Sequence, residues 1–150
     1  MTPYERAMIL AFMARNQLNG NHNFLICHSG PNPVLKFLLG FPWNPLYETL
    51  IARCCIVVFT ETQIIIYTMP TLTNFPALPD ISLMAKGIQV IDQSTLRSFQ
   101  VGASFQDKYL RLQSIGFPRY YYLYINEADP FTQEFNFWHL EDTNFYGWKK

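Results

Sequence analysis

The N-terminal residues place apolar side chains with a helical period, which predicts a helix over residues 2–19. Thr2 and Glu5 have the spacing of a capping box, and Pro3 occupies the first helical position, where its missing N–H costs no hydrogen bond. The pair Asn19-Gly20 is a helix stop signal. The apolar face is expected to be wide, and its members are Ala7, Leu10, Ala11 and Leu18, extended by Met8, Ile9, Phe12 and Met13.

Residues 20–46 contain short patterned segments separated by prolines. Residues 23–27 fit a short strand, and the sequence leaves open whether this strand joins a sheet. Residues 33–39 fit a short helix with Asn32 as its N-cap and Gly40 as its stop. Two prolines soon afterwards exclude a continuous helix or strand. We therefore expect residues 1–46 to form an N-terminal helical segment packed on the rest of the chain.

Residues 47–150 are expected to form an antiparallel β domain closed by a helix. From about residue 50, β-branched and aromatic residues dominate, as is typical of strands. Six strands are predicted, over residues 50–59, 63–69, 88–91, 96–104, 109–115 and 119–125. The polar turn 60–62 joins the first two as a hairpin, and the turn 116–118 joins the last two. Residues 70–87 carry three prolines and are expected to be mostly loop.

The last predicted strand, residues 119–125, carries bulky side chains on both of its faces. A strand of this kind is either covered on both sides within the fold or faces a partner. The three tyrosines of one face, Tyr120, Tyr122 and Tyr124, are therefore candidate interface residues.

A second helix is predicted near the C-terminus, with Asp129 as its N-cap and Pro130 as its first residue. Phe131, Phe135 and Trp138 have the spacing of one helical face, which is expected to pack on the core. Phe137 and Trp148 do not fit easily on that same face. Rings left off the core face should be exposed or meet another protomer, so Phe137 and Trp148 join the candidate interface residues.

The composition indicates a folded domain with more aromatic surface than it can bury. Apolar residues make up 49% of the chain, aromatic residues 17% and charged residues 15%. Such a composition excludes a disordered chain, which would be poor in aromatic residues. A domain of 150 residues is not expected to conceal all thirteen Phe, nine Tyr and three Trp. An exposed aromatic patch indicates a partner, and self-association is the first interpretation.

Charge and cysteine content argue against several classes of protein. The formal net charge is zero, so the basic excess that a nucleic-acid-binding protein needs is missing. Three cysteines without a secretory leader pattern do not indicate a disulfide framework. The longest apolar run, residues 54–59, is far shorter than the ~20 residues of a membrane-spanning helix. We therefore expect a cytoplasmic protein without a transmembrane segment.

The reactive side chains predict no catalytic, cofactor or metal site. Cys54 and Cys55 are neighbours on a predicted strand, so their side chains point to opposite faces, and the pair Cys27-His28 has the same geometry. With the two other histidines they do not supply the convergent ligand set that a metal requires. Cys27 paired with a distant histidine keeps an enzymatic alternative open. Neither a nucleophile elbow nor a phosphate-binding glycine loop accompanies it.

Two segments carry a resemblance to a known fold family. Residues 62–67 have the sequence TQIIIY on the second strand of the first hairpin, and residues 91–99 have the sequence IDQSTLRSF in a link between strands. With a following meander and one closing aromatic helix, the region from about Glu48 onward resembles the pleckstrin-homology-like (PH-like) domains of many small uncharacterised bacterial proteins. The resemblance covers about two-thirds of the chain.

The resemblance implies an α+β fold in which a bent antiparallel sheet or open β-barrel is capped by the C-terminal helix. The family has seven strands, so either residues 23–27 supply the seventh or it lies within residues 70–87. Phosphoinositide binding, known in the wider superfamily, is not expected. Phosphate groups need basic residues on the first hairpin, whose turn holds Glu61 with Arg53 alone nearby.

Three functions follow from these expectations, in order of preference. The first is a non-enzymatic protein-interaction domain that self-associates, or binds another protein, through aromatic surface. The second is a binder of a small apolar ligand in a cavity between the sheet and the N-terminal helix. The third is an enzyme centred on Cys27 or a histidine.

Overall fold

The computed structural model of the chain describes residues 3–18, 21–38, 53–69, 87–104, 107–124 and 133–149. Its elements, in chain order, are α1 (Pro3–Arg15), β1 (Phe24–Gly30), α2 (Pro33–Leu38), β2 (Cys54–Phe59), β3 (Gln63–Thr68), β4 (Ile88–Asp92), β5 (Ser98–Ser104), β6 (Asp107–Gln113), β7 (Arg119–Leu123), α5 (Gln133–Asp142) and α6 (Asn144–Gly147). The expected cap at Thr2, the stops at Asn19-Gly20 and Gly40, the loop 70–86 and the helix start at 129–131 lie outside the described residues. Among the described helices, none has the length and apolar character that crossing a membrane requires.

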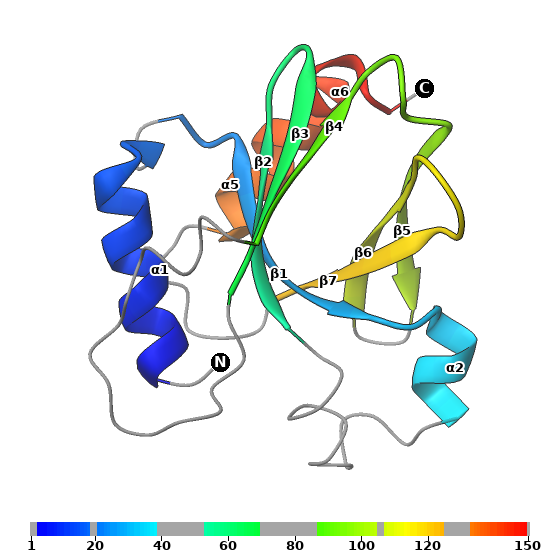
Figure 1. The fold of residues 1–150 in the computed structure, drawn as a ribbon, viewed down its shortest axis with the longest axis horizontal. Helices are drawn as coiled ribbons and strands as arrows, with labels where there is room; N and C mark the ends of the chain where they lie inside the picture. The colour runs from blue at the N-terminus through cyan, green and yellow to red at the C-terminus, as the bar shows by residue number, and fades with distance from the viewer. Residues whose placement is uncertain are drawn as a thin grey trace.

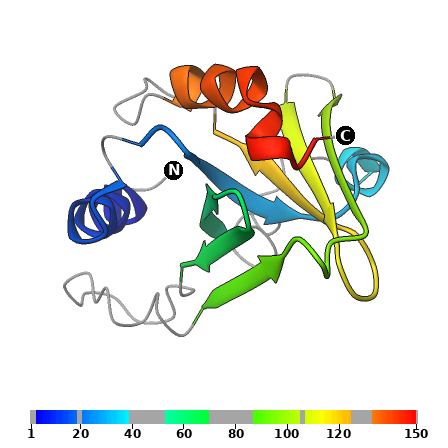
Figure 2. The same cartoon turned by 90° about the horizontal axis from the view of Figure 1, so that it is seen from above.

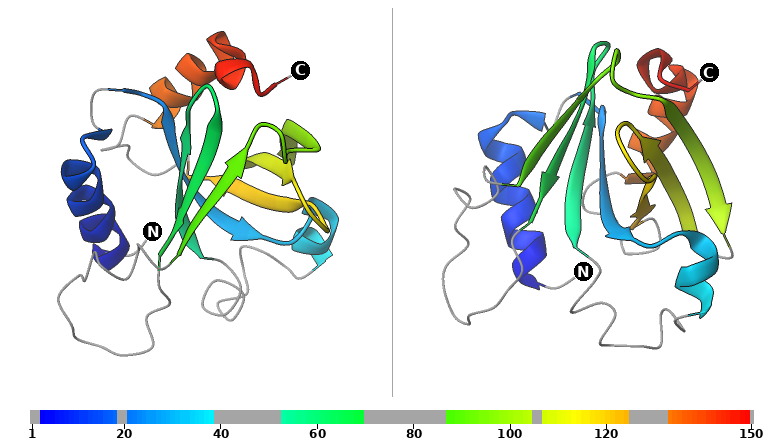
Figure 3. Two further views of the ribbon diagram at one scale, coloured as in Figure 1. Left: turned by 45° about the horizontal axis from the view of Figure 1, so that its top comes forward. Right: turned by 45° about the vertical axis from the view of Figure 1, so that its right-hand side comes forward.

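The described strands form one seven-stranded sheet with the order β4-β3-β2-β1-β7-β6-β5, and every neighbouring pair is antiparallel. Strands β1 to β4 form one meander, β5 to β7 form a second, and the pairing of β1 with β7 joins them. Figure 3 shows the two meanders splayed apart on either side of β1. The predicted α+β class, with an antiparallel sheet and a C-terminal helix, is confirmed. Residues 24–30 supply the strand that the sequence left open.

All six predicted strands are present in the described part of the chain, with ends displaced by a few residues. The β2–β3 hairpin is closed by Thr60, whose amide donates a hydrogen bond to the carbonyl of Gln63 at 2.9 Å. Strand β5 begins later than predicted because a turn follows Asp92. The amides of Thr95 and Leu96 both donate to the Asp92 carbonyl, at 2.9 and 3.2 Å, and hold these residues out of the sheet.

Strand β1 changes partners along its length, and this change shapes the sheet. Residues 24–28 pair with β2, whereas residues 27–30 pair with β7. Among the described strands, none pairs with the second edge of residues 24–26. A buried backbone edge needs hydrogen-bond partners, because an unsatisfied N–H or C=O in the interior costs free energy.

Two buried amide side chains of α5 supply partners at this edge. The Ile26 amide donates to Gln133 Oε1 at 3.0 Å, and Gln133 Nε2 donates back to the Ile26 carbonyl at 2.7 Å. One turn later, Asn136 Nδ2 donates to the carbonyl of Phe24 at 3.2 Å. The closing helix is thus fixed to β1 by side chains that take the place of a neighbouring strand.

The buried face of α5 differs from the face predicted from its rings. Gln133, Asn136, Phe137 and Leu140 are buried, whereas Phe135 and Trp138 point outward and are exposed. The prediction that Phe135 and Trp138 pack on the core was therefore wrong. The physical reason is the unpaired edge of β1, because the helix must turn its amide side chains toward that edge.

The sheet separates two hydrophobic cores. The inner face, covered by α5 and α6, holds a core to which every strand contributes, and the outer face of β1 to β3 holds a second core covered by α1. Strand β2 alternates between them, with Cys55 and Val57 in the inner core and Cys54 and Ile56 in the outer one. The prediction that Cys54 and Cys55 point to opposite faces is confirmed. Figure 2 shows α5 and α6 together along one side of the sheet, with α1 and α2 at opposite ends of the molecule.

Helix α1 packs through its largest apolar side chains. Met8, Ile9, Phe12 and Met13 are all buried against the outer face, whereas Ala7 and Leu10 are exposed. Of the wide face predicted for this helix, Met8, Ile9, Phe12, Met13 and Leu18 are buried as expected, whereas the placement of Ala7 and Leu10 on it was wrong. Burying the larger set removes more apolar area from water, and this decides the rotation of the helix. Figure 1 shows α1 lying alongside the β2–β3 arm of the sheet.

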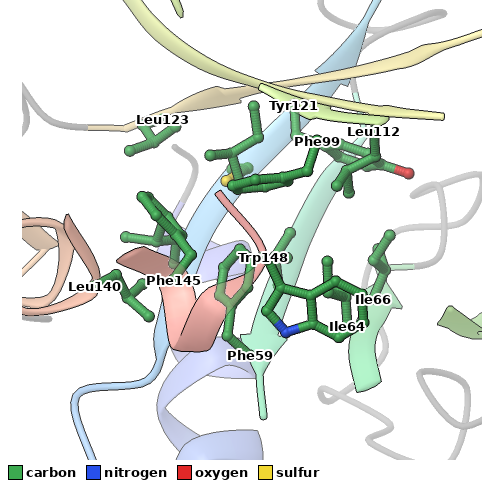
Figure 4. Packing of buried hydrophobic residues seen from close by; sticks show 14 of the residues in the cluster. Phe59, Ile64, Ile66, Phe99, Leu112, Tyr121, Leu123, Leu140, Phe145 and Trp148 are labelled. Carbon is green, nitrogen blue, oxygen red and sulfur yellow. The ribbon is translucent and has the colours of Figure 1, made fainter. Parts of the chain in front are cut away.

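The C-terminal residues close the inner core through a left-handed turn. Four consecutive residues, Asn144 to Gly147, have φ angles of 50°, 51°, 56° and 84°. This turn directs Phe145 and Trp148 inward, where both are buried (Figure 4). The Phe145 ring contacts Phe59 and Phe99 at centroid distances of 5.2 and 5.1 Å, and Trp148 Nε1 donates to the Thr60 carbonyl at 2.7 Å.

Candidate functional site

The residues predicted to form an interface lie mostly inside the fold. Tyr122, Phe137 and Trp148 are buried, with at most 4% of each residue exposed, so they cannot offer rings to a partner in this structure. Tyr120 and Tyr124 are half-buried and pack on neighbours, Tyr120 on the Tyr109 ring and Tyr124 on His28. The reason is that both faces of β7 are covered: Tyr121 and Leu123 lie in the inner core, and Lys36 of α2 lies over the Tyr122 ring on the other face. The sequence allows this strand either to be covered within the fold or to face a partner, and the first interpretation is correct.

The exposed rings of the closing helix are Phe135 and Trp138. These side chains are 58% and 53% exposed, three residues apart and therefore on one side of α5. The opposite side of the same helix is buried. The excess of rings that the composition indicated is thus placed on the outside of α5, although not at the residues predicted.

Charged and titratable side chains surround these two rings. The His22 ring lies edge-on to Phe135 at 4.7 Å and 6.2 Å from the His139 ring, while Lys108 Nζ lies 4.6 Å from the centre of the Trp138 ring. We call this set, Phe135, Trp138, His22, His139 and Lys108, the α5 patch. It combines two apolar rings with a rim of basic and imidazole groups.

The orientation of His22 is fixed by the buried amide of Asn136. His22 Nδ1 lies 2.8 Å from Asn136 Oδ1, while the Asn136 amide nitrogen already donates to Phe24. The Asn136 oxygen is therefore the acceptor, and His22 Nδ1 carries the proton. The patch is consequently built on the same side chain that fixes α5 to β1.

A second cluster of polar groups lies beneath α2, on the outer face of β1 and β7. Lys36 is the buried residue of α2, and its Nζ donates to Asp107 Oδ2 at 2.7 Å. The same ammonium lies 3.5 Å from His28 Nε2 and 3.7 Å from the centre of the Tyr122 ring. His28 in turn stacks on Tyr122 at 5.3 Å. We call His28, Lys36, Asp107 and Tyr122 the Lys36 cluster.

The strand register places the rings of this cluster in one row across the sheet. Gly102 pairs with Tyr109, Tyr109 with Tyr122, and Tyr122 with His28, so their side chains share a face. Glycine at the start of the row leaves room for the Tyr109 ring, because a β-carbon on Gly102 would overlap that ring and the ring would have to shift. Within this row the Tyr109 and His28 rings both contact the Tyr122 ring, and Lys36 of α2 lies over Tyr122.

Burial sets the ionisation of the Lys36 cluster. Burial, followed by the nearby Lys36 charge, lowers the pKa of His28 from 6.5 to about 4, so this imidazole is neutral near pH 7. Burial also lowers the pKa of Lys36, and the hydrogen bond and charge of Asp107 oppose that shift. The cluster therefore contains one ion pair and one neutral imidazole.

Sequence reasoning considered His28 only as a metal ligand and missed both Lys36 and Asp107. A usable signal was the single lysine inside the otherwise apolar helix 33–38, because a lone charge in such a run often has a specific partner. That partner lies 71 residues away, and only the pairing of β1, β7 and β6 brings it close.

The cysteines do not form a reactive centre. All three are buried, and burial raises the pKa of the Cys27 and Cys55 thiols well above the ordinary value. A nucleophilic cysteine needs its thiolate form, which this environment disfavours. Within the described residues, no group of three or more His, Cys, Asp and Glu side chains is placed to hold a metal ion.

Comparison with known proteins places the chain in no family. No protein-family model matches it, and no solved structure matches it. A stretch of 56 residues, 37% of this chain, is 38% identical to part of ATP-binding cassette sub-family A member 2 from Rattus norvegicus. This chain covers 2% of the length of that protein, so the likeness carries no argument about fold or activity.

Proposed function

We propose that this chain is a non-enzymatic protein-interaction domain that self-associates through the α5 patch. The observation that carries the proposal is the outward placement of Phe135 and Trp138, each more than half exposed on one side of a helix whose other side is buried. Large rings exposed together on a rigid helix are typical of contact surfaces, because each buries about 150–250 Å² when covered.

The rim of the α5 patch suits a contact between identical surfaces. In a two-fold dimer the same patch meets itself, so the two rings of one chain would face the two rings of the other. Lys108 would remain at the edge, where a cation over the face of Trp138 stays partly hydrated. Rings at the centre with polar groups at the rim are the usual anatomy of such an interface.

The fold supports the PH-like resemblance as part of this proposal. Seven antiparallel strands followed by a closing C-terminal helix match what that family implies. The described β2–β3 turn carries exposed Glu61 and no basic residue, so we propose protein contact rather than phosphoinositide binding. Domains of this kind serve as binding platforms, and the site rather than the fold must identify the partner.

The test is the molecular mass of wild-type chain and variants by sedimentation equilibrium from about 1 to 200 μM, the range of weak to moderate self-association. We expect the wild type to form a dimer within this range and the double variant Phe135→Ser/Trp138→Ser to remain a monomer. Phe117→Ser is the matched control, because Phe117 is an exposed ring on the β6–β7 turn, outside the patch. It should dimerise like the wild type.

Two results would overturn the proposal. One is a wild type that stays monomeric over the whole concentration range. The other is a double variant that dimerises as strongly as the wild type and the Phe117→Ser control, since the contact would then lie elsewhere.

A further inference from the structure

The Lys36 cluster has the composition of a receptor for a positively charged amine. A carboxylate oxygen, the face of a tyrosine ring and an imidazole nitrogen all converge on one ammonium group, at 2.7, 3.7 and 3.5 Å. A carboxylate supplies charge and a strong acceptor, a ring face supplies a cation–π contact, and a neutral imidazole supplies a further acceptor. We propose that Asp107, Tyr122 and His28 form a binding site for a primary alkylammonium, which Lys36 of the same chain occupies in this structure.

The neutral state of His28 is consistent with its role as a hydrogen-bond acceptor for an ammonium group. A charged imidazole 3.5 Å from an ammonium would repel it, whereas a neutral one can accept a hydrogen bond through Nε2. The lowered pKa of His28 keeps the ring neutral at physiological pH. Tyr124, at 5.1 Å from His28, packs on the same ring.

The exposed apolar side chains of α2 allow another ammonium group to displace Lys36 from this site. Lys36 is the residue that this helix buries, while its four large apolar side chains are exposed: Val34, Leu35, Phe37 and Leu38. A helix normally holds its place by burying its apolar face, and α2 does the opposite. Release of Lys36 by a competing ammonium would therefore forfeit little apolar burial.

The base of α2 has anchors of its own. Tyr122 Oη donates to the Pro31 carbonyl at 2.7 Å, and the Leu35 amide donates to the Asn32 side chain at 2.9 Å. These bonds lie at the start of the helix, so they can persist while the later residues move. The competing amine would come from a lysine side chain of a partner protein or from a free small amine.

The first arm of the test asks whether a competing amine moves α2 in the wild type. Backbone amide resonances of residues 34–38 are followed by NMR while n-propylammonium chloride is added, with sodium chloride and tetramethylammonium chloride at equal ionic strength as controls. Lys36→Ala supplies the resonance positions of α2 without its occupant. We expect n-propylammonium alone to shift the wild-type resonances toward those of Lys36→Ala, because tetramethylammonium has no N–H to donate to Asp107.

The second arm removes the proposed acceptor. Asp107→Asn should weaken the n-propylammonium response by about tenfold or more, because a charge-assisted bond is replaced by a neutral one. The matched control is Glu141→Gln, which alters the other described lysine–carboxylate pair, the half-buried Lys149–Glu141, at 2.5 Å. The response of α2 should be unchanged in that variant.

A third arm distinguishes the source of the amine. Nα-acetyl-lysine methylamide that moves α2 as well as n-propylammonium does assigns the site to a protein lysine. A response to n-propylammonium alone assigns it to a small free amine.

The proposal is overturned if n-propylammonium leaves residues 34–38 of the wild type unmoved up to about 100 mM, a concentration far above the dissociation constant of a built site. Lys36 would then be a structural ion pair, even if Lys36→Ala itself bound the amine. If Lys36→Ala does not fold, Lys36→Met, which keeps the side-chain stem without the charge, supplies the reference positions. The wild-type and Asp107→Asn arms need neither variant.

Discussion

A few buried polar residues determine how the strands and helices of this structure are arranged. Gln133, Asn136, His28 and Lys36 are buried among apolar side chains, and they are the buried polar residues of the part of the chain that the structure describes. Each has a partner far away in the sequence, such as Ile26 for Gln133 and Asp107 for Lys36. A buried polar group without a partner is costly, so these residues select one arrangement of the strands and helices.

His28 should make the stability of the protein depend on pH. The unfolded chain takes up the His28 proton near pH 6.5, whereas the folded chain takes it up only near pH 4. The unfolded state therefore binds more protons between these values, and the free energy of unfolding falls as pH falls from about 6.5 to about 4. A shift of this size corresponds to roughly 3 kcal/mol over the whole window.

The measurement is urea unfolding at pH 7 and pH 4.5 for the wild type, His28→Phe and His139→Gln. We expect His28→Phe to lose much less stability than the wild type on acidification, because it has no imidazole to protonate. His139 lies outside the Lys36 cluster, so His139→Gln is the control and should behave like the wild type. Equal acid sensitivity in all three chains would contradict the burial of a neutral His28.

The residue scale is also where sequence reasoning was weakest. The sequence predicts rings on both faces of residues 119–125, yet the choice between a covered strand and one that faces a partner depends on the inner core and on Lys36 of α2, which cover the two faces of β7. Tyr122 is a predicted interface residue because its strand is bulky on both faces, and Phe137 and Trp148 are predicted ones because they do not fit the predicted core face of the last helix. The sequence predicts that the N-terminal helical segment packs on the rest of the chain, but it does not predict the inward turn of α6 that buries Trp148.

At the scale of elements, most of the secondary structure followed from local signals. The turn at residues 60–62, the Asn32 cap and the strand patterns each act over a few residues, so they are visible in the sequence. The rotations of α1 and α5 were not predictable in the same way. Both depend on which surface the helix meets, and for α5 that surface is an unpaired strand edge created by the splay of β1.

The contact between α5 and β1 should contribute measurably to stability. Gln133→Leu removes both hydrogen bonds to Ile26 while keeping a side chain of similar size, and it leaves the buried Ile26 amide without its acceptor. We expect a loss of about 2–3 kcal/mol in the free energy of unfolding, measured by urea titration. Asp142→Ala, at an exposed position of the same helix, should change it by less than about 0.5 kcal/mol. A Gln133→Leu variant as stable as the wild type would show that α5 does not depend on this edge.

At the scale of the whole molecule, the composition predicts that some aromatic rings stay on the surface, but it does not predict where they lie. The excess of rings does appear outside, on α5, on α2 and at the β6–β7 turn. Its location could not be predicted, because the two cores on opposite faces of one sheet absorb many of the rings. Strands β1 to β3 contribute side chains to both cores, so a change of packing under α1 should also alter the packing under α5.

The left-handed turn of residues 144–147 makes the stability of the protein depend on the chirality of the residues within it. L-residues lose roughly 1–2 kcal/mol each in this conformation, whereas their mirror images prefer it. A semisynthetic chain with D-alanine at position 144 should therefore resist urea better than one with L-alanine there. At position 142, in the right-handed α5, a chain with D-alanine should have a lower urea unfolding midpoint than a chain with L-alanine. The chirality of residues 144–147, as well as their side chains, thus determines how stably this turn covers the inner core.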